Sequence, residues 1–282
     1  MENSPIISVN NLSISFKTDE GLVHAVKNIS FELKRGEILG IVGESGSGKS
    51  VSSLAIMGLL DKTVATFPTG DITYFKETEK INLLTLEEED FRKERGNNFS
   101  MIFQEPMTSL NPVYTCGDQV AESLKLHKGL NNNDAKKEVI RIFEEVELPR
   151  PEKIFDSYPH EISGGQKQRV MIAMAICCEP TLLIADEPTT ALDVTVQQEI
   201  IDLILRLRDK NNMAVIFISH DLSLVANISD KIAVMRKGEL VETGTAKEIF
   251  TAPKHPYSKG LIYCKPQLDT NYKVLPLSLI HI

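Results

Sequence analysis

Short apolar runs alternate with stretches of helical periodicity through the middle of this chain. The runs have the length and composition of strands buried on both faces, which predicts strands at Ile38–Val42, Phe99–Phe103, Leu182–Ala185 and Val215–Ile218. Apolar helices are expected after two of them, over Val51–Leu60 and Val194–Asp209. Buried strands that alternate with helices are typical of an α/β domain built on a mainly parallel sheet.

The flanks of this core show the period-2 alternation of antiparallel strands. On the N-terminal side, strands are expected at Ile6–Val9, Leu12–Phe16, His24–Glu32, Gly70–Tyr74 and Ile81–Leu84, with a turn at Asp19–Gly21. Thr85 and Glu88 match a capping box, so a helix is expected from there to about Arg95. On the C-terminal side, the sequence predicts a hairpin of Lys231–Met235 and Glu239–Glu242, a helix Thr245–Phe250 and an extended tail.

A helical insertion is expected between the strands of the core. Apolar residues recur at helical spacing from Gly117 to Leu148, with a polar break at Leu130–Asp134, and Ser163 can cap a further helix. We therefore expect one domain over residues 1–252, with a helical subdomain at about 113–178. Residues 253–282 would form a C-terminal tail that ends as though truncated.

The residues directly after the first buried strand predict a nucleotide site. Gly43–Ser50 fits the G-x-x-x-x-G-K-[ST] pattern, whose glycines let amide groups crowd around a polyphosphate. The helix that starts near Lys49 adds the positive end of its dipole. Lys49 would reach the β- and γ-phosphates, and the Ser50 hydroxyl would hold Mg²⁺. A chance glycine-rich turn would lack the strand before it and the helix after it.

Polar side chains follow three more buried strands. Gln104 follows the second strand, Asp186 and Glu187 the third, and His220 the fourth. All should lie at one edge of the sheet, where ligands bind in open parallel sheets. Because side chains alternate along a strand, Asp186 and Glu187 should point in different directions. One carboxylate can then approach Mg²⁺ while the other faces an attacking water.

A second anion site is expected at the start of the helix that Ser163 caps. Gly164 and Gly165 leave the positive end of that helix bare. One nucleotide needs only one phosphate loop, so the second site predicts two copies of the chain that face each other across ATP.

Composition excludes several classes of protein. The net charge of −8, with no long basic tract, argues against a broad nucleic-acid surface. The four cysteines show no metal-binding spacing and are expected to be reduced, with Cys177 and Cys178 in the core. No window approaches the roughly 18 apolar residues of a membrane helix, and the start lacks a signal-peptide pattern. We therefore expect a soluble, cytoplasmic protein.

The order of the motifs resembles that of the ATP-binding subunits of ABC transporters, from about Ile6 to Leu268. The counterparts are Walker A at Gly43–Ser50, the Q-loop at Gln104, the signature at Ser163–Gln166, Walker B at Leu182–Glu187, the D-loop through Asp193 and the switch histidine at His220. Gln104–Pro112, Ser-Tyr-Pro-His at 157–160, Met171–Ala175 and His255-Pro-Tyr resemble the oligopeptide/dipeptide and nickel importer group. The resemblance implies a P-loop NTPase core of the RecA type, with an antiparallel β subdomain and a helical insertion.

The resemblance also implies a role for each residue. Glu187 would take a proton from the attacking water, and Gln104, His220 and Lys49 would complete the catalytic set. Mg²⁺ would be held by Ser50, Gln104 and Asp186. ATP would contact Phe16, Gly43, Glu44, Ser45, Gly46, Ser47, Gly48, Lys49, Ser50, Ser163, Gly164, Gly165, Gln166 and Asp193. Spacing alone leaves Phe16 equally compatible with a core position, whereas similarity favours stacking on adenine.

The implied partners are a second ABC ATPase subunit, membrane permease subunits and, indirectly, an extracellular or periplasmic substrate-binding protein. The chain would then lie on the cytoplasmic face of the membrane and power uptake of di- or oligopeptides, with nickel or another solute as the alternative. Two non-transport classes fit less well. Chromosome-maintenance ATPases need long coiled coils, and no sustained heptads are present. Ribosome-associated factors have two tandem ATPase units, for which the chain is one unit short and too acidic. No nucleic-acid partner is expected.

Overall fold

A six-stranded, mainly parallel sheet forms the centre of the computed structural model, which describes residues 5–19, 21–76, 79–104, 109–190 and 192–263. The strands lie in the order β10-β9-β3-β8-β7-β6, with only β10 antiparallel to its neighbour. Their bounds are β3 (Ile38–Val42), β6 (Phe99–Ile102), β7 (Leu182–Asp186), β8 (Ala214–Ser219), β9 (Lys231–Arg236) and β10 (Glu239–Thr245). The predicted α/β class and its buried strands are confirmed.

A second, antiparallel sheet packs beside the first, in the order β2-β1-β4-β5. Its strands are β1 (Pro5–Thr18), β2 (Gly21–Lys34), β4 (Ala65–Lys76) and β5 (Glu79–Asn82). The separate strands predicted at 6–9 and 12–16 are one strand, in which Asn11 adopts a positive φ where the register shifts. The period-2 alternation is interrupted at this one irregular residue, so the sequence pattern predicted two strands where the structure has one.

The sequence was misleading between the second sheet and β6. The strand predicted at Ile81–Leu84 is present, but its bounds are wrong: β5 covers Glu79–Asn82, and a 3₁₀ turn, η1, covers Leu83–Thr85. The predicted capping box is also wrong: the Thr85 hydroxyl donates to the Asn82 carbonyl, and α2 (Glu88–Glu94) begins after Glu87. The Asn82 side chain accepts from the Leu84 amide instead, which favours the tight turn.

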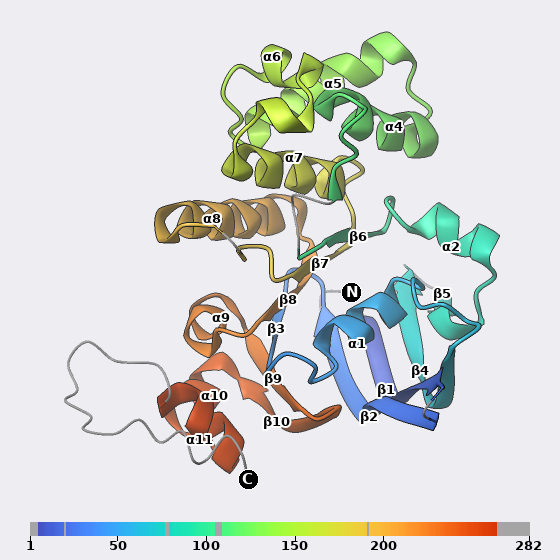
Figure 1. Cartoon of the computed structure of the whole chain (residues 1–282), viewed down its shortest axis with the longest axis vertical. Coiled ribbons are helices and arrows are strands. Elements are labelled where there is room, and N and C mark those ends of the chain that lie inside the picture. Colours follow the sequence, from blue (N-terminus) through green and yellow to red (C-terminus); the bar gives the residue numbers. More distant parts are fainter. Residues whose placement is uncertain (1–4, 20, 77–78, 105–108, 191, 264–282) are drawn as a thin grey trace.

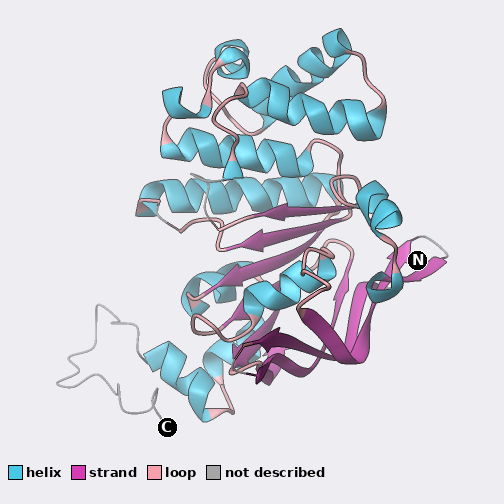
Figure 2. Cartoon of the chain, turned by 45° about the vertical axis from the view of Figure 1, so that its right-hand side comes forward, coloured by secondary structure: helices cyan, strands magenta, loops and turns pink. Residues whose placement is uncertain are grey.

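Helices cover the large sheet in successive layers (Figures 1 and 2). In Figure 1, α4, α5 and α6 form the top layer, followed by α7, then α8, and then the strands. The helices are α1 (Lys49–Ile56), α2, α4 (Cys116–Lys128), α5 (Asn132–Glu145), α6 (Pro151–Asp156), α7 (Gly164–Ile176), α8 (Val194–Asn211), α9 (Leu222–Ile228), α10 (Ala246–Thr251) and α11 (Pro256–Tyr263), with a 3₁₀ turn η2 (Pro159–Glu161). The extended tail predicted from residue 253 is wrong as far as Tyr263, because Pro256 starts α11; the rest lies outside the described residues.

The large sheet separates two apolar cores, and β3 shows how. Ile38 and Val42 belong to the core beneath the helical layers, whereas Leu39 and Ile41 face the core shared with the second sheet. Successive residues of a strand point to opposite faces, so each wholly apolar strand serves both cores. The side chains at the ends of these strands are therefore held by packing on two sides.

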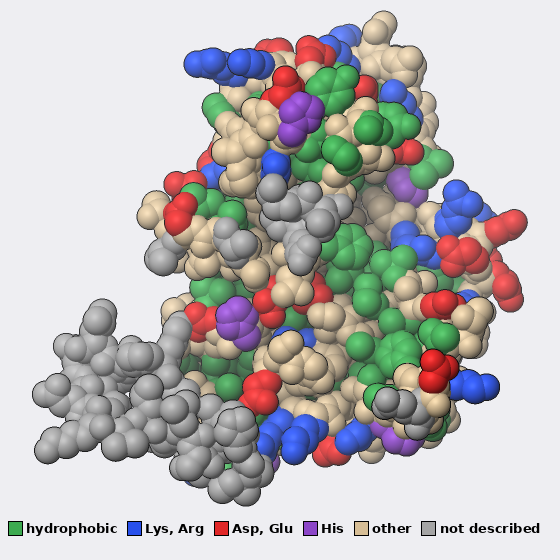
Figure 3. Space-filling model, viewed as in Figure 1, with side chains coloured by type: hydrophobic (Ala, Val, Ile, Leu, Met, Phe, Trp, Pro, Cys, Tyr) green, Lys and Arg blue, Asp and Glu red, His purple; other side chains and the backbone are tan. Residues whose placement is uncertain are grey.

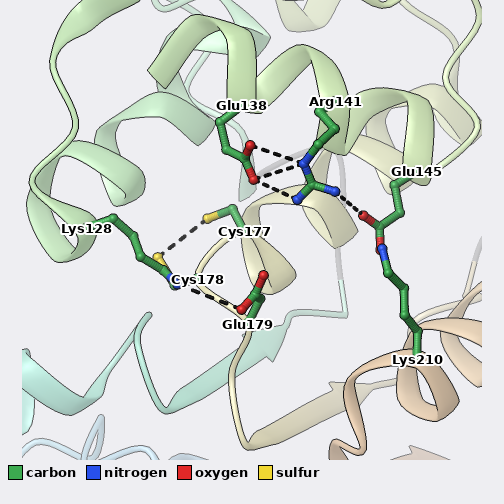
Figure 4. A network of polar contacts seen from close by, with 8 residues as sticks. All are labelled: Lys128, Glu138, Arg141, Glu145, Cys177, Cys178, Glu179 and Lys210. Atoms are coloured by element: carbon green, nitrogen blue, oxygen red, sulfur yellow. Dashed lines mark hydrogen bonds and ion pairs between the residues drawn. The ribbon is translucent and has the colours of Figure 1, made fainter. Parts of the chain in front are cut away.

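Ion pairs link the helical layers at their edge (Figure 4). Arg141 of α5 pairs with Glu138 and Glu145, and Lys210 of α8 pairs with Glu145 at 2.7 Å. The two cationic groups are about half exposed, so water screens each pair, which should contribute only about 0–1 kcal/mol. Beside them, Cys177 and Cys178 are buried with their sulfur atoms 3.9 Å apart, which confirms their predicted place in the core.

Close packing of α9 on β3 requires a glycine in the strand. A Cβ atom on Gly40 would lie 2.0 Å from Val225 Cγ1 and 2.6 Å from Ser229 Oγ, both on the α9 side. The helix starts at Leu222, three residues after Ser219, the last residue of β8. Asp221 caps it by accepting from the Ser223 and Leu224 amides. Gly40 therefore fixes how near α9, and the loop before it, can approach the sheet.

We expect Gly40→Ala to destabilise the protein by about 1–3 kcal/mol, because the added methyl group overpacks the contact between β3 and α9. Urea denaturation followed by circular dichroism would measure the change. Gly260→Ala is the control, because a Cβ atom there meets none of the described residues within 4 Å, and it should leave stability unchanged or slightly increased. A Gly40→Ala variant as stable as the parent would show that α9 can retreat from the sheet.

Candidate functional site

The loop between β3 and α1 has the geometry of an anion cradle. Gly46 and Gly48 have φ of 76° and 103°, and Gly48 is the residue that precedes the first turn of α1. A Cβ atom on Gly48 would lie 2.7 Å from the Ala25 carbonyl oxygen, so only glycine fits against β2. The loop amides and the positive end of α1 therefore face the same small space.

The side chain of Lys49 bonds to the inner side of this loop. Its ammonium donates to the carbonyl oxygens of Gly43 and Glu44 at 2.8 and 2.9 Å, and the residue is only 5% exposed. Burial lowers the Lys49 pKa, and the negative charges of Glu187, Asp186 and Glu44 oppose that shift. A phosphate would offer this ammonium a charged acceptor in place of two neutral carbonyls.

Three polar side chains contact one carboxylate oxygen of Glu187. Its Oε2 accepts from Gln104 Nε2 at 3.3 Å and from the Thr190 hydroxyl at 3.0 Å, and it lies 3.2 Å from Nδ1 of His220. These groups come from the ends of β6, β7 and β8. Glu187 adopts a positive φ of 47°, and its amide donates to the Ile218 carbonyl. Such backbone strain is typical of functional sites.

Asp186 lies on the other side of the same strand end, at the start of α1. It is 4% exposed, and its Oδ1 has no hydrogen-bond partner among the described residues. Burial raises the Asp186 pKa and the charge of Glu187 adds to the shift, whereas the Ser50 hydrogen bond and Lys49 oppose it. An unpaired buried carboxylate oxygen beside a serine hydroxyl suits a hard cation such as Mg²⁺, which prefers oxygen ligands.

A polar cavity of about 150 Å³ joins most of these groups. It is lined by Ala25, Ser45, Gly46, Gly48, Lys49, Ser50, Val51, Gln104 and Glu187. Asp186 lines an adjoining cavity together with Ser50 and Gln104. Phe16 is not among the described lining residues; it is half-buried on β1 and packs against the core of the second sheet. Stacking of Phe16 on a base stays a prediction.

The other predicted anion site lies apart from this cavity. The Ser163 hydroxyl caps α7 by accepting from the backbone amide of Gln166, and the Gln166 side-chain oxygen accepts from the backbone amide of Ser163. The predicted cap is confirmed. Ser163 and Gly164 are exposed and are absent from the described cavity lining. Gly165 approaches Val196 of α8, whose first turn is capped by Asp193. Within one chain, the two predicted phosphate sites are therefore separate.

Sequence reasoning missed two partners of the site residues. Thr190 bonds Glu187, and the signal for it was the Pro-Thr-Thr that follows the paired carboxylates. Tyr257 of α11 also reaches the phosphate loop, where its hydroxyl accepts from the Glu44 amide at 3.1 Å. No local pattern indicates a contact between residues so far apart in the chain.

Comparison with known proteins identifies a family for each part of the chain. The family described as "ABC transporter" matches residues 26–190, and "Oligopeptide/dipeptide transporter, C-terminal region" matches residues 241–279. The chain is 48% identical to the glutathione import ATP-binding protein GsiA of Salmonella typhimurium over 269 residues, and 49% identical to that of Escherichia coli K12 over 264 residues. These alignments cover 95% and 93% of this chain but only 43% and 42% of the relatives, so the chain spans less than half of their length.

Solved structures show the same architecture. The ATP-binding cassette MJ0796, in a dimeric post-hydrolysis state bound to ADP and Pi, superposes with a TM-score of 0.74 at 26% identity and covers 85% of this chain and 98% of its own. The cbiO1 protein of Clostridium perfringens, part of the cbiONQ transporter complex, gives a TM-score of 0.72 at 27% identity, over 89% and 92% of the two chains.

The buried Asp186 carboxylate, whose Oδ1 has no partner among the described residues, should reduce stability at neutral pH. Its raised pKa means that the folded protein binds this proton more tightly than the unfolded chain does, so stability falls as pH rises between the two pKa values. We expect Asp186→Asn to unfold at a higher temperature than the parent at pH 7–8 when no metal or nucleotide is added.

The advantage of Asp186→Asn should shrink as pH falls from the raised pKa of the folded protein toward about 4, the ordinary pKa of an aspartate, and should be nearly absent below it. Thermal scans across pH would measure it, with exposed Asp19→Asn as the control for loss of one negative charge. Equal midpoints for Asp186→Asn and the parent at pH 8 would contradict the assignment of a destabilising buried charge.

Proposed function

This chain belongs to the ABC transporter family of ATP-binding domains, and we propose that it hydrolyses ATP to drive uptake of di- or oligopeptides through a membrane permease. The observation that carries the ATPase proposal is the convergence of Gln104, Thr190 and His220 on Glu187, beside the phosphate loop. A carboxylate held from three directions at the rim of an anion cradle is suited to fix a water molecule.

Hydrolysis needs a water in line with the γ-phosphate and positive charge around the leaving oxygens. Three side chains hold Oε2 of Glu187, so its other oxygen can accept the hydrogen bond and then the proton of the water. Lys49 would exchange the Gly43 and Glu44 carbonyls for phosphate oxygens. His220, whose side chain is 67% exposed, can turn to the γ-phosphate. Bound Mg²⁺, held by Ser50 and Asp186 with Gln104 beside it, would add positive charge.

Two copies of the chain would complete the site. Ser163 and Gly164 lie exposed, Gly165 is partly exposed, and all three lie apart from the cavity, which supports a role in binding a nucleotide held by another chain. We propose a head-to-tail dimer with ATP between Lys49 of one copy and Ser163 of the other, and with Asp193 at the contact. The dimeric state of the similar cassette MJ0796 supports this arrangement. A related ATPase could replace the second copy without changing the chemistry.

An apolar groove next to Gln104 is the proposed contact for the permease. It has a volume of about 250 Å³ and includes Met57, Leu59, Met101, Phe103, Met171 and Met174. Leu59 and Phe103 are 39% and 42% exposed. Figure 3 shows hydrophobic side chains gathered between the helical layers and the lower part of the molecule. Flexible methionines and an exposed phenylalanine suit an apolar helix of a membrane partner, which would sense closure through Gln104.

The relatives support a proposal for the substrate and the location. Those at 48% and 49% identity are named for import of glutathione, a peptide, and the C-terminal family match is described for oligopeptide and dipeptide transporters. We therefore propose di- or oligopeptides as the solute and a peripheral position on the cytoplasmic side of the membrane. Within the described residues, no helix is both long and apolar enough to cross a membrane.

Glu187→Gln should lower the rate of ATP hydrolysis by a factor on the order of 10² to 10⁴, because the amide cannot accept the proton of the water. ATP binding should persist, and nucleotide-bound dimers should accumulate in size-exclusion chromatography. The exposed Glu79→Gln on β5 is the matched control and should hydrolyse ATP as the parent does. Parental turnover by Glu187→Gln would exclude Glu187 as the base.

Mixing two inactive variants would test the shared site. Lys49→Ala removes the phosphate-loop charge, and Ser163→Arg blocks the start of α7, so each homodimer should be inactive. A mixed head-to-tail dimer contains one site with both defects and one site with neither. If chains pair at random, half of the dimers are mixed, so mixing equal amounts should restore up to about one quarter of parental ATPase activity when the sites act independently. If both motifs served the same chain's nucleotide, mixing would restore nothing.

A further inference from the structure

One hydrogen bond joins the C-terminal part of the chain to the phosphate loop. The hydroxyl of Tyr257, on α11, accepts from the backbone amide of Glu44 at 3.1 Å. Tyr257 is 3% exposed, so water competes little for this bond. The catalytic scheme above makes no use of the contact, and α11 lies outside residues 26–190 of the ABC family match.

Neighbouring groups hold Tyr257 in place. The guanidinium of Arg236, at the end of β9, lies 4.8 Å from the centre of the Tyr257 ring. The Tyr257 amide donates to Nδ1 of His255, and the carboxylate of Glu242 on β10 accepts from the amides of Lys254 and His255 at 2.7 and 3.0 Å. A chain of bonds therefore runs from β10 through His255 to Tyr257 and Glu44.

The bond fixes a peptide group that Lys49 also uses. The peptide group between Gly43 and Glu44 donates its N–H to Tyr257, and its carbonyl oxygen, on Gly43, accepts from Lys49 Nζ at 2.8 Å. The next carbonyl, on Glu44, accepts from Lys49 Nζ at 2.9 Å and from the Ser47 amide at 3.2 Å. When Lys49 turns to a phosphate, the Glu44 carbonyl loses its charged donor. The Tyr257 bond can persist, so it would keep the first turn of the loop in place while the amides further along bind the phosphates.

The Tyr257 hydroxyl stays neutral in this setting. Burial raises its pKa, and the Glu44 carboxylate, a second partner of the hydroxyl, adds to the shift, whereas the bond from the Glu44 amide and the charge of Arg236 oppose it only in part. A neutral hydroxyl can accept from the Glu44 amide and donate its own proton at the same time. The contact is therefore expected to hold across the physiological pH range.

We propose that Tyr257 is a positioning residue for ATP binding, through which the segment from Glu242 to Tyr257 sets the shape of the phosphate loop. The proposal rests on the ATPase function proposed above and adds a role for the C-terminal region. Tyr257 acts on the nucleotide through the Glu44 peptide and makes no contact with the reacting atoms.

Tyr257→Phe tests the proposal, because it removes the hydroxyl and keeps the ring. In full-chain protein, the KM for ATP and the Kd for a fluorescent ATP analogue should both rise by about 2- to 10-fold, the effect of one net hydrogen bond, while kcat changes less than about 2-fold. Tyr74→Phe is the matched control. Tyr74 lies on β4, away from the phosphate loop. It is 1% exposed, and its hydroxyl forms a hydrogen bond with the Thr181 hydroxyl at 3.1 Å.

Both variants should lose some thermal stability, but only Tyr257→Phe should bind ATP more weakly. If its KM and Kd equal those of Tyr74→Phe, Tyr257 is merely structural and the proposal is overturned. Glu242→Gln provides an independent test should Tyr257→Phe fold poorly, because the amide keeps only one of the two bonds to the Lys254 and His255 amides. It should raise the Kd in the same direction, and an unchanged Kd would count against the proposal.

The binding measurement separates this proposal from the ATPase function. A parent chain that binds the analogue but does not hydrolyse ATP would refute the ATPase function, and the comparison of Tyr257→Phe with Tyr74→Phe would still decide the role of Tyr257. A parent that hydrolyses ATP while Tyr257→Phe matches it in KM and Kd would retain the ATPase function and reject the positioning role.

Discussion

Asp186, Glu187 and Lys49 lie together at the carboxyl edge of the large sheet, where little water reaches them. Burial raises the pKa of Asp186 and lowers that of Lys49, so the fold disfavours the charged form of each group. Lys49 offsets part of the cost of charging Asp186, whereas the like charge of Glu187 adds to it, and one oxygen of Asp186 has no partner among the described residues. In the proposed function, a magnesium-bound polyphosphate would supply a cation to Asp186 and an anion to Lys49.

The fold holds these charges in place by backbone contacts from several elements. Gly48 packs against a β2 carbonyl, the Gly238 amide of the β9–β10 turn donates to Ser47, and Tyr257 bonds the Glu44 amide. Each contact fixes the loop through its main chain, so the amide groups stay available for an anion without large reorganisation. Pre-organised dipoles of this kind are the main source of electrostatic stabilisation in phosphoryl transfer.

The sequence predicted those features that arise from local patterns. Wholly apolar runs predicted the buried strands, and the spacing of Gly43–Ser50 predicted the loop, because both depend on neighbours in the chain. The short helices α6, α9 and α11 were missed, since six to eight residues give too little periodicity. Asp221 and Pro256 were their available signals. The capping box predicted at Thr85 was wrong because Asn82 stabilises a 3₁₀ turn at the same place. The Tyr257 contact depends on tertiary packing alone, so no local pattern predicts it.

Ser163 lies apart from the phosphate loop within one chain. In the proposed transport cycle, ATP binding across two chains would therefore drive dimer closure. A ligand shifts a conformational equilibrium only by its difference in affinity for the two states. If ATP is gripped by Lys49 of one copy and by the α7 amides of the other, both sets of contacts exist only in the closed dimer. Moving such an equilibrium from 1:99 to 99:1 needs about 5.5 kcal/mol of differential affinity, which a few charge-assisted hydrogen bonds to the γ-phosphate can supply. Cleavage of that phosphate then removes the very contacts that favour closure, so opening follows from the chemistry of the site and needs no separate trigger.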